Sequence, residues 1–510
     1  MAAPYEPVPR MRSIAPMPLW RLLLSLFVAA PLLALAQHKP GETVIEHGTV
    51  RNEEGAAVPY EIGTLYVPEN RSKADSRLIG IGFARIKSPQ PTGAPPVFWL
   101  PGGPGLSVLD AFAKNDMGKL RTWLGLNTVG DLVVIEQRGY TARGEMLEAR
   151  REALPLDRPA SVEASAQAMR ARAKAAVAAN PGKDLSGYDI AAFAADVDDL
   201  RRALGYGKIS LFGGSFGSQW SLAVMRLHPR IVARAVLSGV EPLNNGYDMP
   251  SQVYASLQRI AYEADRDPGL KPYLPPGGTM AALRALHERF AQGSVSVPVR
   301  DESGQTRTVV LGAEDLQLAL LSHTQEAERW PAFILSLYHG HYEDWARETI
   351  EDRQAADTIL IGPLADSSLG VSADREHLLR TDPAVTMLGT WNFEANIASA
   401  PDWPTRDMGD DVRKPVPSDI PVIFVHGDWD TSTPIDNTLG LLPYFHNGHA
   451  ILVHRGGHDG AFYQLRNEPA AKQAVYDFLK TGRMQGLPTE VALPLPEFER
   501  PDFPPPASPF

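Results

Sequence analysis

Short, wholly apolar runs that end at glycine or proline stand out in the first half of the chain. Residues 97–100 (Val-Phe-Trp-Leu) stop at Pro101, and residues 132–135 (Leu-Val-Val-Ile) stop at a Glu-Gln-Arg-Gly sequence. Such runs are typical of strands that are buried on both faces of a parallel sheet. Residues 58–67 and 78–87 are also predicted to be strands.

Apolar residues recur at helical spacing in the segments between later strands. Residues 160–179 are rich in alanine and mixed charges, and residues 189–204 carry apolar side chains every three or four positions before a glycine. Both segments are predicted to be helices. In the second one, the acidic side chains of Asp196, Asp198 and Asp199 are expected on the solvated face.

The alternation of strand and helix continues to residue 240. A strand is expected over residues 208–212, followed by a glycine-rich turn, a helix that ends at about Leu227, and a strand over residues 232–240. Strands that alternate with helices favour a parallel sheet with helices on both faces. The sequence therefore predicts an α/β fold with a mostly parallel, doubly wound sheet, whose first part spans residues 37–240.

Residues 241–417 break this alternation. They are mostly helical in pattern, with one hairpin expected around residues 301–304. We therefore expect a large helical cap inserted into the core. The second part of the core spans residues 418–484, with strands over residues 421–427 and 450–454, a helix after Pro434 and a helix over about residues 468–479.

Both ends of the chain are expected to lie outside the core. Arg10 and Arg12 precede an apolar stretch, residues 19–36, that ends in Ala-Leu-Ala. This pattern predicts a secretory signal peptide over residues 1–36, because its uninterrupted apolar run is far shorter than the ~20 residues that span a bilayer. We expect an exported protein, periplasmic or secreted, without a stable membrane span. Residues 485–510 contain eight prolines and are expected to form an extended tail.

The composition excludes several kinds of chemistry. The chain has no cysteine, so disulfides, thiolate metal sites, iron–sulfur clusters and thiol nucleophiles are excluded. Its net charge of −11 gives no general attraction to nucleic acid. A nucleophile, if there is one, is therefore expected to be a serine.

Residues 213–217 read Gly-Gly-Ser-Phe-Gly and match the Gly-x-Ser-x-Gly pattern. In this pattern, small residues allow a tight turn from strand to helix that exposes the serine hydroxyl at the carboxyl edge of the sheet. The pattern alone is common, but here it lies between a predicted strand and a predicted helix. Ser215 is therefore the candidate nucleophile.

An acid and a histidine are expected to follow the serine in chain order, each after a later strand. Asp430 follows the strand over residues 421–427, and His458 follows the strand over residues 450–454. His458 would deprotonate the serine, and Asp430 would orient its imidazole. Asp428 is the alternative acid, whereas His426 and His454 are expected to be packed and hydrogen-bonded.

Two backbone amides are needed to stabilise an oxyanion. One is expected from Phe216, the residue after the nucleophile, and the other from Gly103 in the Pro-Gly-Gly-Pro-Gly loop that follows residues 97–100. His339 and His341 lie near two acids, but without further ligands at a defined spacing we expect a solvated loop there and no metal site. The expected chemistry requires no cofactor.

Taken together, these motifs resemble those of the α/β-hydrolase-fold serine aminopeptidases, namely the proline iminopeptidases and the secreted tripeptidyl aminopeptidase-like proteins. The shared motifs are residues 101–105, 136–139, 213–217, 427–434 and 457–458, in the family's order from about residue 58 to 480. The chain departs from the family pattern at Pro101, where the family has histidine, and at Glu136, where it has aspartate.

The resemblance places Ser215, Asp430 and His458 on the family's catalytic residues, with Gly103 and Phe216 at the oxyanion donors. It implies an exported hydrolase that releases residues or short peptides from peptide N-termini through an acyl-enzyme. The expected partner is a peptide with a free N-terminus. A secreted carboxylesterase with the same three residues, and a non-catalytic binding protein of the same fold, are the alternatives.

The resemblance also implies that the cap recognises the ammonium group of the substrate, which requires a carboxylate. Glu394 and Asp402 are the main candidates. Further candidates are Glu326, Glu328 and Asp344.

Overall fold

A computed structural model describes residues 38–507 of the chain, except residues 245–246, 301–303, 324, 459–461, 463–464 and 466–467. The predicted signal peptide, residues 1–36, lies outside the described residues. No helix in the described part of the chain is both long and apolar enough to cross a bilayer.

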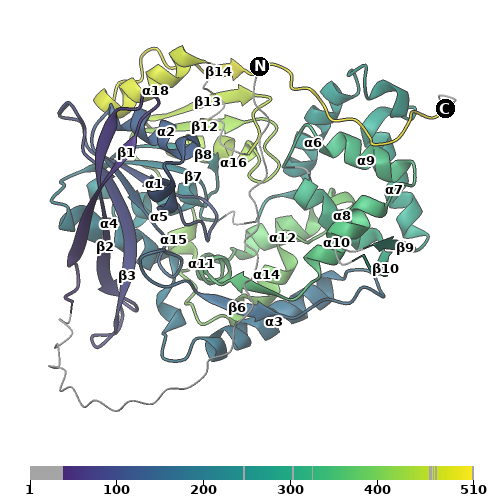
Figure 1. Cartoon of the computed structure of the whole chain (residues 1–510), viewed down its shortest axis with the longest axis horizontal. Helices are drawn as coiled ribbons and strands as arrows, with labels where there is room; N and C mark the ends of the chain where they lie inside the picture. The colour runs from purple at the N-terminus through teal and green to yellow at the C-terminus, as the bar shows by residue number, and fades with distance from the viewer. Residues whose placement is uncertain are drawn as a thin grey trace, which may run out of the picture. The chain divides into compact units, whose positions relative to one another are not determined.

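A sheet of ten strands forms the core, in the order β1-β2-β3-β5-β4-β7-β8-β12-β13-β14. Figure 1 shows β1, β2 and β3 on one side of the core and β12, β13 and β14 on the other. The strands from β5 to β14 in this order are parallel, whereas β1, β2 and β3 pair antiparallel and join the rest through β3 and β5. Their bounds are β1 Thr43–Arg51, β2 Ala57–Pro68, β3 Leu78–Ile86, β4 Val97–Leu100, β5 Leu132–Ile135, β7 Ile209–Ser215, β8 Val232–Val240, β12 Val422–Gly427, β13 Gly448–His454 and β14 Glu490–Ala492.

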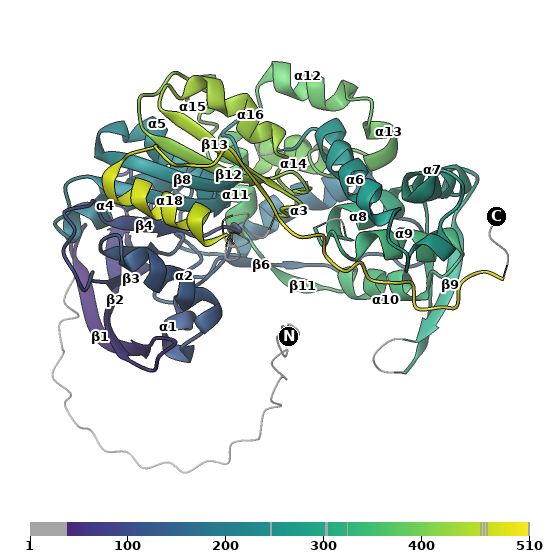
Figure 2. The ribbon, with the colours of Figure 1, turned by 90° about the horizontal axis from the view of Figure 1, so that it is seen from above.

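Two apolar layers enclose this sheet because successive side chains of a strand point to opposite faces. Phe98 packs in one layer with helices α4 and α5, whereas Trp99 packs in the other with α1, α2 and α18 (Figure 2). The predicted fold class, an α/β protein with a mostly parallel, doubly wound sheet, is therefore confirmed. The helices of the core are α1 Asp110–Lys114, α2 Met117–Asn127, α3 Val162–Ala179, α4 Ile190–Ala203, α5 Phe216–Leu227, α16 Asp436–Leu441 and α18 Pro469–Thr481, with short 3₁₀ turns at Leu185–Gly187, Pro229–Ile231 and Leu442–Tyr444.

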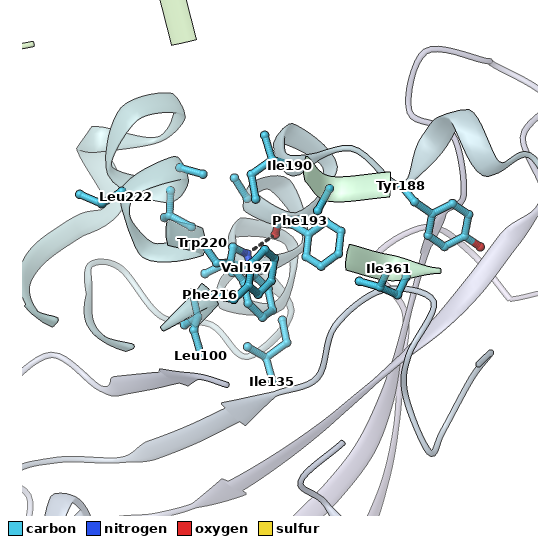
Figure 3. Packing of buried hydrophobic residues seen from close by; sticks show 14 of the residues in the cluster. Leu100, Ile135, Tyr188, Ile190, Phe193, Val197, Phe216, Trp220, Leu222 and Ile361 are labelled. Carbon is cyan, nitrogen blue, oxygen red and sulfur yellow. Dashed lines mark hydrogen bonds between the residues drawn. The ribbon is translucent and has the colours of Figure 1, made fainter. Parts of the chain in front are cut away.

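Helix α5 is held against helix α4 by an aromatic cluster (Figure 3). The rings of Phe193, Phe216 and Trp220 meet edge to face or tilted, with centroids 5.6 to 6.4 Å apart. The indole N–H of Trp220 donates a hydrogen bond of 2.9 Å to the carbonyl of Phe193, so this buried polar group is satisfied. The cluster thus fixes α5, and with it the turn at Ser215.

The segment between β8 and β12 is mostly helical, as predicted, and has an apolar core of its own that includes Leu257, Leu286, Trp330 and Trp345. The expected hairpin is present as β9 and β10, while its tip at residues 301–303 lies outside the described residues. The elements are α6 Pro250–Ala264, η3 Lys271–Tyr273, α7 Gly278–Ala291, β9 Val295–Arg300, β10 Thr306–Leu311, α8 Ala313–His323, α9 Trp330–Tyr338, α10 Glu343–Asp352, β11 Ala356–Ile359, α11 Ile361–Leu369, α12 Ala373–Thr381, α13 Val385–Leu388, α14 Glu394–Ser399, η4 Ala400–Asp402 and α15 Asp410–Arg413.

Segments before β8 also contact this insertion. Strand β6 (Glu148–Arg151) pairs antiparallel with β11, and helix α3 packs against α14. The tail also joins the core, since β14 extends the sheet beside β13. These pairings were not predicted, because the four-residue and three-residue strands involved are too short to show a period.

The interpretation of Asp196 as a solvated residue is wrong. Its side chain is only 1% exposed and accepts two hydrogen bonds of 2.7 Å from the fully buried guanidinium of Arg138. Arg71 adds an ion pair of 2.5 Å to the same carboxylate. Asp196 therefore faces a buried arginine beside the sheet, and its charge is compensated there.

Candidate active site

Ser215 is the last residue of β7 and lies at the start of helix α5. Its backbone has a positive φ of 55°, which is uncommon and costs a non-glycine residue energy, and such strained residues cluster at active sites. The hydroxyl lies within hydrogen-bonding distance of His458, in the loop that follows β13. The Gly-x-Ser-x-Gly pattern thus has the strand–turn–helix context that was expected of it.

The two outer glycines of the pattern are required by close backbone contacts. A methyl group at Gly213 would lie 2.2 Å from the carbonyl oxygen of Gly217, and one at Gly217 would lie 2.1 Å from the carbonyl oxygen of Leu100. At Gly214 the nearest atom would be 3.6 Å away, which is an ordinary contact. Residues 213 and 217 therefore cannot carry a side chain, whereas residue 214 has room for one.

The structure brings the three predicted side chains together. His458 Nε2 lies 3.1 Å from Ser215 Oγ, and His458 Nδ1 lies 3.1 Å from both carboxylate oxygens of Asp430. The imidazole is 15% exposed, whereas the carboxylate is 1% exposed. A hydroxyl, an imidazole and a buried carboxylate in this order form a chain along which a proton can move from the serine to the histidine.

Asp430 is held by more than its histidine partner. The backbone N–H groups of Ser432 and Thr433 donate to Oδ1 at 2.9 and 2.8 Å, and the Thr433 hydroxyl donates to Oδ2 at 2.9 Å. Burial alone would raise the pKa of Asp430, but the charge of His458 and hydrogen bonds from His426 and His458 outweigh burial and hold this pKa well below its ordinary value. The carboxylate is therefore ionised and fixed in place.

The alternative acid, Asp428, makes different contacts. Its carboxylate accepts a hydrogen bond of 2.8 Å from the Arg455 amide and lies 2.9 Å from His454 Nδ1. It thus joins the loop after β12 to the loop after β13, without contacting His458. His426, as expected, is buried and hydrogen-bonded, with ring nitrogens 2.7 Å from the Thr438 hydroxyl and 2.6 Å from the Thr433 carbonyl.

The glycine-rich loop after β4 passes directly beside the serine. A methyl group at Gly102 would lie 3.3 Å from Ser215 Cβ and 3.1 Å from the Gly214 carbonyl oxygen. The amide of Gly103, the predicted oxyanion donor, makes no hydrogen bond to any residue within the described ranges. Phe216 is the first residue of α5, where a helix has amides without an intrahelical acceptor. Both predicted donors thus come from segments that adjoin Ser215.

The predicted carboxylates for substrate binding are mostly bound by arginines. Glu394 pairs with Arg380, and Asp402 lies 3.8 Å from Arg170. Neither acid contacts the serine, the histidine or Asp430 among the residues that the structure describes. Of the further candidates, Glu326 and Asp344 pair with Arg329 and Arg347, and Glu328 is exposed.

A second group of carboxylates near the site was missed by the sequence analysis. Glu241 directly follows β8, Asp248 lies seven residues later, and Asp366 belongs to α11. Burial, with the charges of Asp366 and Asp248, raises the pKa of Glu241 well above its ordinary value. Burial raises the pKa of Asp366 to about 7, and burial and the charge of Asp430 raise that of Asp248 to about 7. The signal that could have identified Glu241 is its place at the carboxyl end of a buried strand.

Few polar partners compensate these three acids. Asp248 accepts one hydrogen bond of 3.0 Å from Asn437. The carboxylates of Glu241 and Asp366 make no hydrogen bond or ion pair with any described side chain or amide, and both residues are half-buried. Unpaired carboxylates in a desolvated setting attract a cation.

Within the described ranges, no three or more histidine or acidic side chains, including Glu241, Asp248 and Asp366, are arranged so that they could hold a metal ion. His339 Nε2 lies 2.9 Å from the carbonyl oxygen of Tyr273, and His341 stacks on Phe503 with ring centroids 3.9 Å apart. These two histidines therefore contact a backbone carbonyl and an aromatic ring.

The solved structures that resemble this chain share little sequence with it. An esterase from Thermogutta terrifontis has 14% identity over 82% of this chain and 98% of its own, with a TM-score of 0.33. An esterase from Exiguobacterium antarcticum has 13% identity over 80% and 97%, with a TM-score of 0.34. Epoxide hydrolase A from Mycobacterium thermoresistibile has 15% identity over 79% and 95%, with a TM-score of 0.32. Scores this low do not distinguish one substrate class from another.

A search of curated proteins found no match to the chain. A family model described as the alpha/beta hydrolase fold matches residues 167–443, which is more than half of the chain and includes Ser215 and Asp430. Since the sheet order, the strained serine turn and this match agree, the chain belongs to the alpha/beta hydrolase family.

Proposed function

We propose that the protein is a serine hydrolase that acts through Ser215, His458 and Asp430. His458 takes the proton of the Ser215 hydroxyl as its oxygen attacks the scissile carbonyl. The negative oxygen of the tetrahedral intermediate accepts hydrogen bonds from the amides of Gly103 and Phe216. His458 then donates its proton to the leaving group, which departs and leaves an acyl-enzyme. Water, deprotonated by His458, releases the acyl group and restores the serine.

We propose further that the substrate is a peptide with a free N-terminus. The observation that carries this proposal is the position of Glu241 in the group formed by Glu241, Asp248 and Asp366. The backbone amide of Glu241 donates a hydrogen bond of 2.9 Å to the Ser218 hydroxyl, which donates one of 2.7 Å to the carbonyl of Ser215. Two carboxylates of the group lack a cationic partner in the described part of the chain. Their raised pKa values show that the free protein stabilises the ionised carboxylates poorly. An ammonium ion would supply the missing positive charge and stabilise the ionised forms, whereas the acyl chain of a neutral ester would not.

The group also revises which acids are candidates for this role. Glu394 and Asp402 already have arginine partners, so binding an ammonium there would first require breaking an ion pair. Glu241 and Asp366 require no such exchange. We therefore assign the ammonium of the substrate to Glu241 and Asp366 in place of Glu394 and Asp402.

The test uses three substrates with the same chromophore: an aminoacyl p-nitroanilide, its N-acetyl form and an acyl ester. We expect the free amine to be hydrolysed with the highest kcat/KM. Glu241→Gln should lower kcat/KM for the free amine roughly 10- to 100-fold, as for loss of a partly buried charge pair, and leave the N-acetyl substrate unchanged. Glu497→Gln, at an exposed glutamate of the tail, is the matched control.

Two results would count against these proposals in different ways. If a fluorophosphonate fails to label Ser215, with Ser215→Ala as the blank, the protein is not a serine hydrolase of this type. If Ser215 is labelled but free and N-acetyl substrates react equally, the hydrolase stands and the aminopeptidase does not. Preference for the acyl ester would favour the carboxylesterase alternative.

A further inference from the structure

The side chain of Gln137 holds the loop that passes beside Ser215. Its Nε2 donates hydrogen bonds of 2.7 Å to the Gly102 carbonyl and 3.2 Å to the Pro101 carbonyl. Its Oε1 accepts a hydrogen bond of 2.6 Å from the Gly105 amide. One amide side chain therefore binds three backbone groups on either side of Gly103.

This contact follows from the sheet order. Strands β4 and β5 are parallel neighbours, so the loops at their carboxyl ends lie together. Gln137 is the second residue after β5, and the loop it binds follows β4 directly. The Gln137 side chain is fully buried, so each of its polar atoms requires a protein partner.

The preceding residue binds the next part of the same loop. Glu136 is fully buried, and its Oε1 accepts hydrogen bonds from the Ser107 hydroxyl and the Val108 amide, at 2.5 and 3.0 Å. Its Oε2 accepts from the Thr141 hydroxyl at 2.6 Å and from the Ala142 amide at 2.9 Å. The loop beyond Gly105 is thus anchored by Glu136, whereas Gln137 makes the side-chain hydrogen bonds to Pro101, Gly102 and Gly105.

We propose that Gln137 is a positioning residue of the hydrolase: it orients the Pro101–Gly105 backbone so that the Gly103 amide points at the oxyanion formed on the substrate of Ser215. The inference rests on the proposed hydrolase function. Prolines restrict φ at positions 101 and 104, but the three glycines have no side chains that could fix the loop, and two of them have positive φ, at 108° for Gly103 and 94° for Gly105. The hydrogen bonds of Gln137 add order at these glycine positions.

Loss of the Gln137 side chain is expected to affect kcat rather than KM. An oxyanion forms only in the transition state, so a misplaced amide lowers kcat and leaves KM nearly unchanged. Removing an oxyanion donor altogether costs about 10²- to 10³-fold in kcat, so loosening one is expected to cost roughly 10- to 100-fold. An aminoacyl boronic acid should lose affinity by a similar factor, because its adduct with the serine places an oxygen at the oxyanion position.

The test compares Gln137→Leu with wild type, using kcat, KM and the boronic acid inhibition constant on the full chain. Asn127→Leu is the matched control, since Asn127 is also a buried amide that donates to two backbone carbonyls, Ile86 at 2.9 Å and Gly130 at 3.3 Å, away from the site. We expect only Gln137→Leu to lower kcat and weaken the boronic acid, with KM within about twofold of wild type.

Gln137→Glu keeps the proposal testable if the leucine variant does not fold. An ionised carboxylate can still accept from the Gly105 amide but cannot donate to the Pro101 and Gly102 carbonyls. Protonation restores one O–H donor. The ratio of its kcat to that of wild type should therefore rise as the pH falls, which a merely structural defect would not produce.

The outcomes separate this inference from the function on which it rests. If wild type neither hydrolyses the substrates nor labels Ser215, the proposed function fails. If wild type is active, an unchanged kcat in a folded Gln137→Leu, an equal loss in Asn127→Leu, or a pH-independent ratio for Gln137→Glu would overturn the positioning role alone.

Discussion

Gly239 lies directly against the imidazole of His458. A methyl group on Gly239 would lie 3.4 Å from both Nδ1 and Cε1 of that ring, and 3.3 Å from the Thr433 hydroxyl oxygen. The residue also has a positive φ of 51°. The end of β8 therefore packs against the histidine, where a methyl group would fit only in tight contact with the Thr433 hydroxyl and the imidazole.

Gly239→Ala is accordingly expected to strain the backbone and to press on the Thr433 hydroxyl, which lies 3.2 Å from His458 Nδ1. We expect kcat to fall roughly tenfold and the free energy of unfolding to fall by about 1 kcal/mol, as for alanine at a positive φ. Steady-state kinetics and denaturant unfolding measure the two effects. Gly207→Ala is the control, because its methyl group would have no neighbour within 4 Å and its φ is not positive. If the two variants had the same kcat and the same free energy of unfolding, the contact between Gly239 and the site would not matter.

Replacing Asp430 and Asp428 in turn should separate their roles. Asp430→Asn should lower kcat by about 10⁴-fold, the size of the effect seen when the acid of a serine–histidine–acid site becomes an amide. Asp428→Asn keeps an acceptor for the Arg455 amide and does not touch His458, so kcat should fall less than about tenfold. Kinetic constants measured with melting temperatures test this. If Asp428→Asn lowered kcat more than Asp430→Asn does, Asp428 would be the acid that acts on His458.

Most of the sheet could be predicted from the sequence, because buried parallel strands such as residues 97–100 and 132–135 have an unmistakable apolar pattern. The structure places Ser215, Asp430 and His458 together, since each follows a predicted strand whose carboxyl end lies at one sheet edge. Chain order alone does not decide whether Asp430 or Asp428 is the acid that orients His458. The hydrogen bonds of the two aspartates distinguish them, because Asp430 contacts His458 and Asp428 contacts His454.

The group of Glu241, Asp248 and Asp366 could not be predicted, because its members belong to segments that only the folded chain brings together. The burial of Asp196 could not be predicted for the same reason, as its arginine partners lie 58 and 125 positions away. A sequence shows that a residue is charged, but not what faces it.

Asp366 should make the stability of the protein depend on pH. Burial raises its pKa to about 7 from an ordinary value of 3.8. Between these values the folded chain holds a proton that the unfolded chain has lost, so stability falls as the pH rises from about 4 to about 7, and is level above this range. Asp366→Asn has no proton to lose. Its stability relative to wild type should rise across this window, by about 1 kcal/mol or more at pH 8. Melting temperatures at pH 4, 6 and 8 test this, and a constant difference between the two proteins would contradict it.

Phe498 in the tail is expected to contribute more to stability than its position in a proline-rich segment suggests. Its side chain is 3% exposed and packs against Trp429, the neighbour of Asp430, with ring centroids 6.3 Å apart. Phe498→Ala should therefore lower the free energy of unfolding by about 3 kcal/mol, as for a buried phenylalanine. Phe503→Ala is the matched comparison, since Phe503 is partly exposed on His341, and should cost about 1 kcal/mol. Denaturant unfolding of both variants tests this prediction. If both lowered the free energy of unfolding by the same small amount, the tail would lie on the surface without stabilising the fold.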